Sequence, residues 1–173
     1  MTSRQFRHLI TFGFGAAVLL WAPIVEAQSA ADAKRTIRAQ RKYYKEPGFM
    51  GAEIRYMRGT LLVTGWVRDE AQLEQATEIG DNVKGVKDLR NRLVVKDYPV
   101  EAATDAEILK GIDTSLDSDE ELARARRKLE ITAESGNVTI VGKVNDYSVV
   151  SAIVRDVRKV PGVVSLNFDK LKW

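Results

Sequence analysis

Few side chains in this sequence could take part in covalent or metal chemistry. The chain has no cysteine and a single histidine, His8, so beyond residue 8 it lacks thiol and imidazole nucleophiles, disulfides and the usual zinc ligands. Carboxylate pairs or a Ser-Lys dyad could still act as acid, base or nucleophile. However, Asp and Glu are scattered over positions typical of solvent-facing helices, and no phosphate-binding glycine loop is present. The sequence therefore favours a binding protein over an enzyme, and it predicts no cofactor and no metal ion.

The densest charged segment is a run of cations between residues 34 and 45. At helical spacing, four of them share one face of the helix: Lys34, Arg38, Arg41 and Lys45. Lys42 lies beside this face, and Tyr43 and Tyr44 are side chains that suit the boundary between lipid headgroups and acyl chains. Two interpretations stay open. The segment is either a solvated helix docked by a narrow apolar stripe, or a surface for anionic lipid, where each cation contributes about 1 kcal/mol. The four cations avoid the stripe, so their substitution is expected to leave the fold intact.

The charge of the chain is divided unevenly. Residues 28–98 carry 14 Lys and Arg against 10 Asp and Glu, whereas residues 99–173 carry 11 against 13. The first part is thus net positive and the second net negative. A positive surface suits an anionic phospholipid membrane, and we expect no nucleic-acid partner because the chain carries an export signal.

That signal occupies residues 1–27. Arg4 and Arg7 precede an apolar stretch over residues 9–20, and Val25, Glu26 and Ala27 provide a cleavage site with small or short residues. Cleavage after Ala27 would start the mature chain at Gln28 and deliver it to the periplasm. The alternative is an uncleaved anchor, because residues 9–25 approach the length of a short membrane-spanning helix.

A 77-residue internal repeat organises the remainder. The same gapless offset aligns turn and core residues of one copy with those of the other: Glu53 with Glu130, Gly59 with Gly136, Gly65 with Gly142, Val83 with Val160, and Gly85 with Gly162. A period of this length is a small domain and not a solenoid unit. We therefore predict a first domain over residues 28–98, a linker over 99–104 and a second domain over 105–173. The exposed segment 96–103 should join two independently folded units.

Each copy is expected to contain helix, strand, strand, helix and strand in that order. The first helices begin at Ser29 and at Thr104, the latter in a capping box with Glu107. Hairpins follow over residues 52–63 and 129–140, and the last strands cover residues 86–95 and 163–168. A short extra helix, starting with the box at Ser118 and Glu121, is predicted in the second copy alone. The fold class is α+β, with a three-stranded sheet packed against two helices in each copy.

Glycines mark the places where the backbone must turn or approach a neighbour. Gly59 and Gly136 belong to hairpin turns, and Gly65 and Gly142 suit a bend or a close backbone contact. The second helices begin at the N-caps Asp69 and Asp146 and end at two further glycines, Gly85 and Gly162. These last two are expected to have positive φ, so they are structural residues and not a binding site.

The order of these residues resembles the BON domain. The pattern is Gly-x-apolar-x-apolar-x-Gly-x-Val, followed one helix later by Val-x-Gly-Val-x-x-apolar. The first copy has it as Gly59, Leu61, Val63, Gly65, Val67, then Val83, Gly85, Val86, Leu89. The second copy has it as Gly136, Val138, Ile140, Gly142, Val144, then Val160, Gly162, Val163, Leu166. The second copy departs from the pattern at its close, where Phe168 stands in place of Asn91.

The resemblance implies an exported, non-enzymatic binding module that protects the cell envelope under osmotic stress, with phospholipid as ligand. It transfers no catalytic residue to this chain. The alternative is a periplasmic chaperone or protein-interaction module whose partners are envelope proteins or unfolded client chains. Salt should separate the two, because electrostatic lipid binding weakens as ionic strength rises and apolar client binding does not.

Overall fold

A computed structural model describes residues 29–97 and 102–173 of the chain. The predicted leader, its cleavage point after Ala27 and residues 99–101 of the predicted linker lie outside the described residues. The first unit contains α1 (Ala30–Tyr44), β1 (Ala52–Met57), β2 (Thr60–Val67), α2 (Glu70–Asp81) and β3 (Asp88–Val95). Its sheet has the order β1-β2-β3, with β1 antiparallel and β3 parallel to β2. Alternate residues of β1 (Ala52, Ile54 and Tyr56) are buried on the face that the helices cover.

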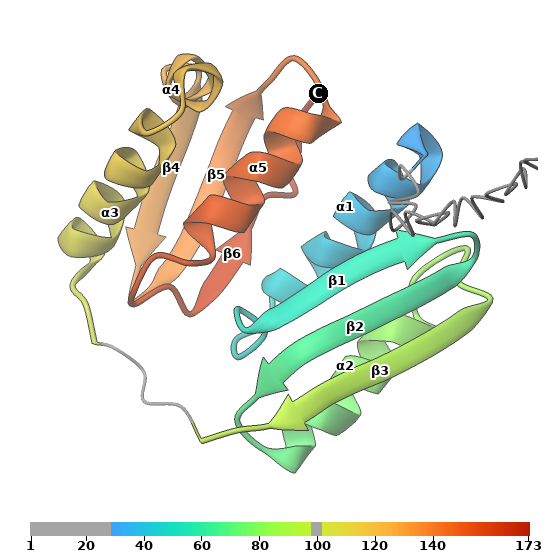
Figure 1. The fold of residues 1–173 in the computed structure, drawn as a ribbon. Coiled ribbons are helices and arrows are strands. Elements are labelled where there is room, and N and C mark those ends of the chain that lie inside the picture. The colour runs from blue at the N-terminus through green and yellow to red at the C-terminus, as the bar shows by residue number, and fades with distance from the viewer. Residues whose placement is uncertain (1–28, 98–101) are drawn as a thin grey trace, which may run out of the picture.

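The second unit repeats this topology. It contains α3 (Asp105–Asp117), α4 (Glu120–Arg126), β4 (Leu129–Glu134), β5 (Asn137–Lys143), α5 (Tyr147–Val157), β6 (Ser165–Asn167) and β7 (Leu171–Lys172). As in the first unit, the hairpin is antiparallel and the last strand is parallel to the middle one. The predicted α+β class and the order of elements in both copies are confirmed, including the extra helix α4 that the first unit lacks (Figure 1).

The helix starts follow the capping residues with one correction. Ser29 accepts from the amide of Asp32, and Thr104 and Glu107 form the complete capping box. The predicted box at Ser118 is wrong, because Ser118 is the C-cap of α3 and its hydroxyl donates to the carbonyl of Ser115 at 2.7 Å. Asp119 caps α4 instead.

The motif glycines have the backbone conformations that their positions predicted. Gly85 and Gly162 have φ of 91° and 86°. Gly65 also has a positive φ, and a Cβ atom there would lie 2.2 Å from the carbonyl oxygen of Gly51. The corresponding atom on Gly142 would lie 2.6 Å from the carbonyl oxygen of Lys128. Their conservation between the copies is thus explained by backbone geometry.

The last strand of the second unit is interrupted at the position where the sequence departs from the repeat. Asn167 lies opposite Thr139, whereas Leu171 lies opposite Gly142. Four residue steps of the edge strand therefore span three steps of β5, which is a bulge. The interruption separates β6 from β7 and places Phe168 in the core with no exposed surface.

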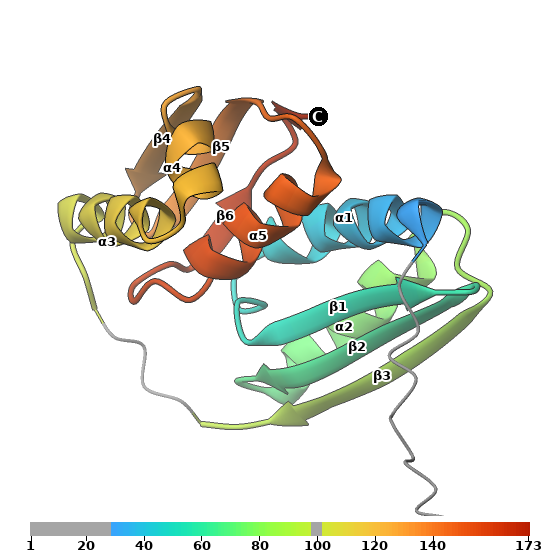
Figure 2. The same cartoon turned by 45° about the horizontal axis from the view of Figure 1, so that its top comes forward.

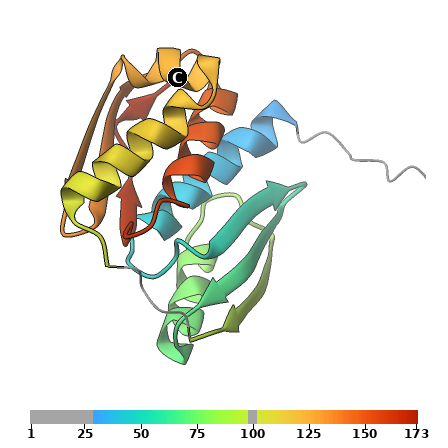
Figure 3. The same ribbon diagram turned by 60° about the vertical axis from the view of Figure 1, so that its left-hand side comes forward.

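Helix α1 packs against both units. It covers β1 of its own sheet and also contacts α5 and β6 of the second unit. Figures 2 and 3 both show α1 beside α5. The buried apolar residues of the two units form one continuous cluster. The sequence did not predict this contact, and independent folding of each unit stays a prediction.

Candidate functional site

Two carboxylates have matching structural roles in the two units. Asp32 accepts from the amide of Arg58 at 3.1 Å, and Asp105 accepts from those of Ser135 and Gly136, each at 2.9 Å. Each of these acids joins the first helix of a unit to the hairpin turn of the same unit. Among residues 29–97 and 102–173, no group of three or more His, Cys, Asp or Glu side chains is placed to hold a metal ion.

The basic face of α1 is the first candidate surface, and its C-terminal half is occupied by the second unit. The guanidinium of Arg41 donates to the carbonyl oxygen of Leu171 at 2.6 Å. It also lies 5.5 Å from the ring centroid of Phe168 and 5.0 Å from that of Trp173. Burial lowers the pKa of Arg41, and the nearby Asp169 carboxylate partly opposes that effect. Arg41 therefore contacts the second unit, and its substitution is now expected to weaken the contact between the units.

The two tyrosines predicted to face lipid are buried. Tyr43 is 0% exposed and Tyr44 is 1% exposed. Their hydroxyl groups donate to backbone carbonyl oxygens, that of Tyr43 to Ala76 at 2.6 Å and that of Tyr44 to Ala52 at 3.1 Å. Burial raises the pKa of both phenols, for Tyr44 to about 12. Tyr43 and Tyr44 hold α1 in the first unit, and their assignment to a membrane interface is wrong.

The other cations of α1 differ in their surroundings. Lys45 forms an exposed ion pair with Asp169 at 3.7 Å, and Lys42 donates to the carbonyl oxygen of Asn82 at 2.9 Å. Lys34 and Arg38 are exposed. Their role as membrane contacts stays a prediction. The structure thus divides the predicted surface into an exposed N-terminal pair and a C-terminal part that contacts the rest of the protein.

The outward face of the first sheet is a second candidate surface. We use this name for the residues of β1, β2 and β3 that point away from the helices: Glu53, Arg55, Met57, Thr60, Leu62, Thr64, Trp66, Asp88, Arg90, Arg92 and Val94. The strand register arranges them in rows, so that Leu62 lies between Arg55 and Arg90, and Trp66 lies beside Val94. Figure 1 shows the face with α2 behind it.

Two apolar members of this face are exposed, whereas Leu62 and Trp66 are half-buried. Val94 is 59% exposed and Met57 is 44% exposed; with Val95, these are the exposed large hydrophobic residues in the described part of the chain. The indole ring of Trp66 lies over Gly51, where a Cβ atom would come within 2.3 Å of the ring. Arginine side chains surround these residues, two of them in exposed ion pairs, Arg55 with Glu53 and Arg90 with Asp88.

The same face of the second sheet has a different composition. The 77-residue offset places Thr132 at the position of Arg55, Thr139 at that of Leu62, Lys143 at that of Trp66 and Asn167 at that of Arg90. Both sheets have the same topology and a helix layer on one side only, so the fold does not require tryptophan or arginine on the outward face. The outward faces of the two sheets thus differ in composition although their topology is the same.

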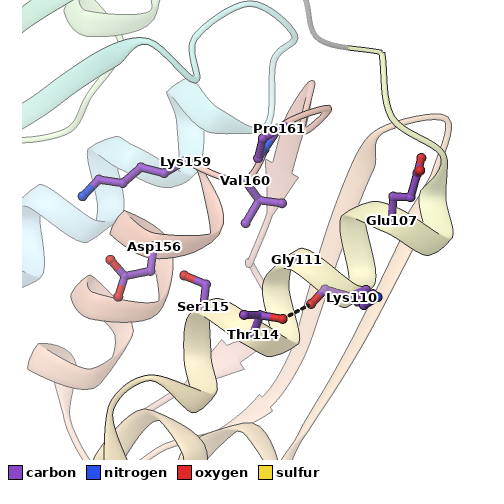
Figure 4. A pocket seen from close by; sticks show the side chains of 9 residues that line it. All are labelled: Glu107, Lys110, Gly111, Thr114, Ser115, Asp156, Lys159, Val160 and Pro161. Atoms are coloured by element: carbon purple, nitrogen blue, oxygen red, sulfur yellow. Dashed lines mark hydrogen bonds between the residues drawn. The ribbon is translucent and has the colours of Figure 1, made fainter.

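A groove between α3 and α5 is a third candidate (Figure 4). Its volume is about 470 Å³, and it exists because Gly111 lacks a side chain opposite Val160. Lys110 and Lys159 stand at its rim, but Figure 4 shows their side chains extending in different directions. Both acids that line the groove have partners. The carboxylate of Glu107 accepts from the amide of Thr104 in the capping box, and that of Asp156 accepts from the guanidinium of Arg155. The groove therefore has no set of polar groups that converge on one ligand.

Sequence reasoning missed the outward face and the inter-unit contact. The face was detectable in principle, because every second residue of β1 to β3 could be compared with its counterpart 77 positions later. The contact was not, since Arg41 and Arg158 meet residues that are 130 and 106 positions away in the chain. A single-sequence pattern contains no signal for such distant pairs.

The fold consists of two α-β-β-α-β units in tandem, with one additional helix in the second. The comparison with protein families matches the BON domain to residues 29–97 and 104–168. The chain belongs to the BON domain family, whose members are generally non-enzymatic. No curated protein matches the chain. In the described residues, no helix has the length and hydropathy needed to cross a membrane.

Two solved structures show a distant likeness. One is the C-terminal domain of CdsD, the structural protein of the Type III secretion system of Chlamydia trachomatis, at 13% identity and a TM-score of 0.33, covering 76% of this chain and 61% of that one. A second structure of CdsD has 14% identity and a TM-score of 0.33, with coverage of 82% and 63%. The match spans about three fifths of those chains. At this level of similarity, neither structure assigns a partner or a function.

Proposed function

We propose that this protein is a non-enzymatic module of the bacterial cell envelope that attaches to anionic phospholipid surfaces. The observation that carries the proposal is the charge of the first BON unit. Residues 28–98 have four more cationic than anionic side chains, and most of these cations, including Lys34, Arg38, Arg90 and Arg92, are exposed. A cationic surface gains about 1 kcal/mol for each lysine or arginine near an anionic leaflet. Membership of the BON family supports the same role.

The proposal includes export to the periplasm. Support comes from residues 1–27, whose basic start, apolar stretch and short residues before Gln28 are typical of a cleaved leader. A protein delivered there meets phospholipid leaflets at the envelope. The BON resemblance implies a role in protecting the envelope under osmotic stress, and we include that role in the same proposal.

Vesicle flotation tests the function. The mature form proposed above, beginning at Gln28, should float with vesicles of phosphatidylglycerol and remain in the dense fraction with vesicles of phosphatidylcholine. The two lipids are chosen with similar acyl chains, so that only the charge of the headgroup differs. Equal flotation with both, or flotation with neither, would reject anionic phospholipid as the ligand.

A second candidate function is protein binding by strand addition. The observation that favours it is the outer edge of β3, which has no neighbouring strand in the described residues and carries the exposed Val95. Such an interaction would retain its strength at high salt, because main-chain hydrogen bonds and apolar contacts dominate it. Binding of an unfolded client chain that survives high salt, without any vesicle binding, would favour this function.

A further inference from the structure

We propose that the outward face of the first sheet, and not helix α1, is the surface that lies on an anionic bilayer. Trp66 and Val94 enter the headgroup region, and Arg55, Arg90 and Arg92 contact lipid phosphates. This inference rests on the proposed function and assigns its site. The occupant is the surface of a phospholipid leaflet, because the face combines cations with exposed apolar side chains.

The register of the sheet arranges the side chains of this face in rows, which form a platform across the three strands. Arg55, Leu62 and Arg90 form one row across the three strands, and Thr64 lies beside Arg92 in the next. Neighbouring strands are about 4.8 Å apart, so the Cα atoms of Arg55 and Arg90 are separated by roughly 10 Å. Long arginine side chains at this spacing can reach separate phosphate groups in one plane, and each guanidinium can bind a phosphate through two hydrogen bonds.

The apolar residues lie at one end of the same platform. Trp66 and Val94 are neighbours across β2 and β3, and Val94 is 59% exposed. Tryptophan is enriched where a bilayer meets water, since its ring is apolar and its indole N–H is polar. The amide of Trp66 donates to the carbonyl oxygen of Gly51, which fixes the backbone under the ring. A rigid aromatic residue beside an exposed valine suits shallow insertion.

This face carries three arginines against two carboxylates, and its net positive charge suits an anionic leaflet. Arg55 and Arg90 have carboxylate partners in exposed ion pairs at 2.8 Å and 2.9 Å. Exposed pairs contribute little to stability, so phosphate can replace the carboxylates at small cost. On the second sheet, the corresponding surface carries Glu130 and Glu134 and lacks any arginine or tryptophan. The repeat thus provides an internal comparison in which one copy keeps a plain solvated face.

The rest of the fold leaves this face available. The opposite face of the sheet is covered by α1 and α2, and α1 is also occupied by α5 and β6. A bilayer that bound the buried tyrosines of α1 would have to detach that helix from its own unit, where their hydroxyl groups bond to the carbonyl oxygens of Ala76 and Ala52. A bilayer on the outward face requires no such rearrangement, because the inter-unit contact lies on the other side of the first sheet (Figure 2).

Trp66 provides a direct probe for the test. In the chain from Gln28 the tryptophans are Trp66 and Trp173, and Trp173→Phe keeps an aromatic ring beside Arg41 while leaving Trp66 as the only indole. On phosphatidylglycerol vesicles, we expect the emission of Trp66 to shift to shorter wavelength and to be quenched by lipids brominated near the headgroup. Unchanged emission and absent quenching in vesicle-bound protein would overturn the inference.

Variants locate the surface independently of fluorescence. Arg90→Gln with Arg92→Gln should weaken vesicle binding roughly 25-fold, since each cation near the leaflet contributes a factor of about five. Lys143→Gln with Lys172→Gln also removes two cations, which lie opposite each other on the outward face of the second sheet, and should weaken binding less than threefold. All four positions are on sheet surfaces that face away from the helices, and circular dichroism confirms that each variant is folded.

A double variant of helix α1 distinguishes an error in this inference from an error in the proposed function. Lys34→Gln with Arg38→Gln should weaken binding by less than about fivefold. If that variant loses binding while the Arg90 and Arg92 variant binds normally, helix α1 is the lipid surface and the inference is wrong, although the proposed function stands. If the unmodified chain binds no phosphatidylglycerol vesicle, the proposed function fails and the inference fails with it.

Discussion

Arg41 and Arg158 cross the contact between the two units in opposite directions. Arg41 of α1 donates to the carbonyl oxygen of Leu171 at 2.6 Å, and Arg158 of α5 donates to that of Ala52 at 2.9 Å. Each also covers an aromatic ring of the other unit, in the case of Arg158 that of Tyr44 at 5.8 Å. Backbone carbonyls hold these guanidinium groups in place of carboxylates. The contact should therefore depend only weakly on salt.

Removal of the Arg158 side chain should destabilise the contact. Arg158→Ala loses hydrogen bonds to two carbonyl oxygens and the stacking on Tyr44, and we expect a loss of about 1–3 kcal/mol in the free energy of unfolding. Arg155→Ala is the matched control, because Arg155 is exposed and pairs with its neighbour Asp156. Urea denaturation measures both. Equal stability of the two variants would show that Arg158 does not hold the units together.

Phe168 explains why the second unit, and not the first, accepts a helix from its neighbour. In the first unit, the side-chain amide of Asn91 donates to the carbonyl oxygen of Leu73 and to the hydroxyl of Thr77. These hydrogen bonds join β3 to α2. In the second unit, Phe168 stands at that position and presents its ring to Arg41. The sequence showed this departure from the repeat, but its consequence required the structure.

Two glycines with the same backbone angle should respond differently to substitution. Gly85→Ala introduces positive-φ strain with open space around the new Cβ, and we expect a loss of about 1 kcal/mol. Gly162→Ala adds a contact of 2.6 Å with the Cβ of Ala103, so its cost should be larger. Gly162→Val should cost at least as much as Gly162→Ala. Thermal unfolding monitored by circular dichroism ranks the three, and a Gly162→Ala variant as stable as the unmodified chain would contradict the strain argument.

The predictable part of the fold is the part encoded by local chemistry. Ser29, Thr104 and Asp146 cap helices because their side chains accept backbone amides within the next three residues, and such bonds follow from the sequence alone. Because the repeat presents each strand and turn twice, the pattern of each copy could be compared with that of the other. Tyr43 and Tyr44 were misassigned because a tyrosine suits a core with an available carbonyl as well as it suits a membrane interface, and only tertiary packing decides between them.

Alkaline pH should weaken the attachment of α1 through Tyr44. The pKa of this phenol is raised to about 12 from an ordinary value of 10.0, chiefly by burial. Its contribution is therefore complete below pH 10 and is lost as the pH rises toward 12. The loss should reach roughly 2–3 kcal/mol. Tyr44→Phe cannot ionise, so its stability deficit at pH 8, about 1 kcal/mol for one hydrogen bond, should shrink or reverse by pH 11. A deficit that stays constant in urea denaturation over this range would contradict the assignment.

Separation of the units tests the predicted linker. Fragments 28–98 and 99–173 should each retain helix and strand by circular dichroism, because each has its own sheet and helices. The second fragment should be the more destabilised relative to the intact chain. Phe168 and Leu171 are both 0% exposed in the intact protein. In the fragment they lose their contact with Arg41. Two unfolded fragments would show that the chain is a single folding unit.

The salt dependence of vesicle binding tests the central claim most directly. Binding of the chain from Gln28 to phosphatidylglycerol vesicles should weaken by at least tenfold as sodium chloride is raised from about 50 mM to 500 mM, because screening shortens the reach of exposed charges. The inter-unit contact should persist over the same range, as judged by unchanged urea midpoints. Strong binding that does not respond to salt would contradict attachment through the cationic first unit.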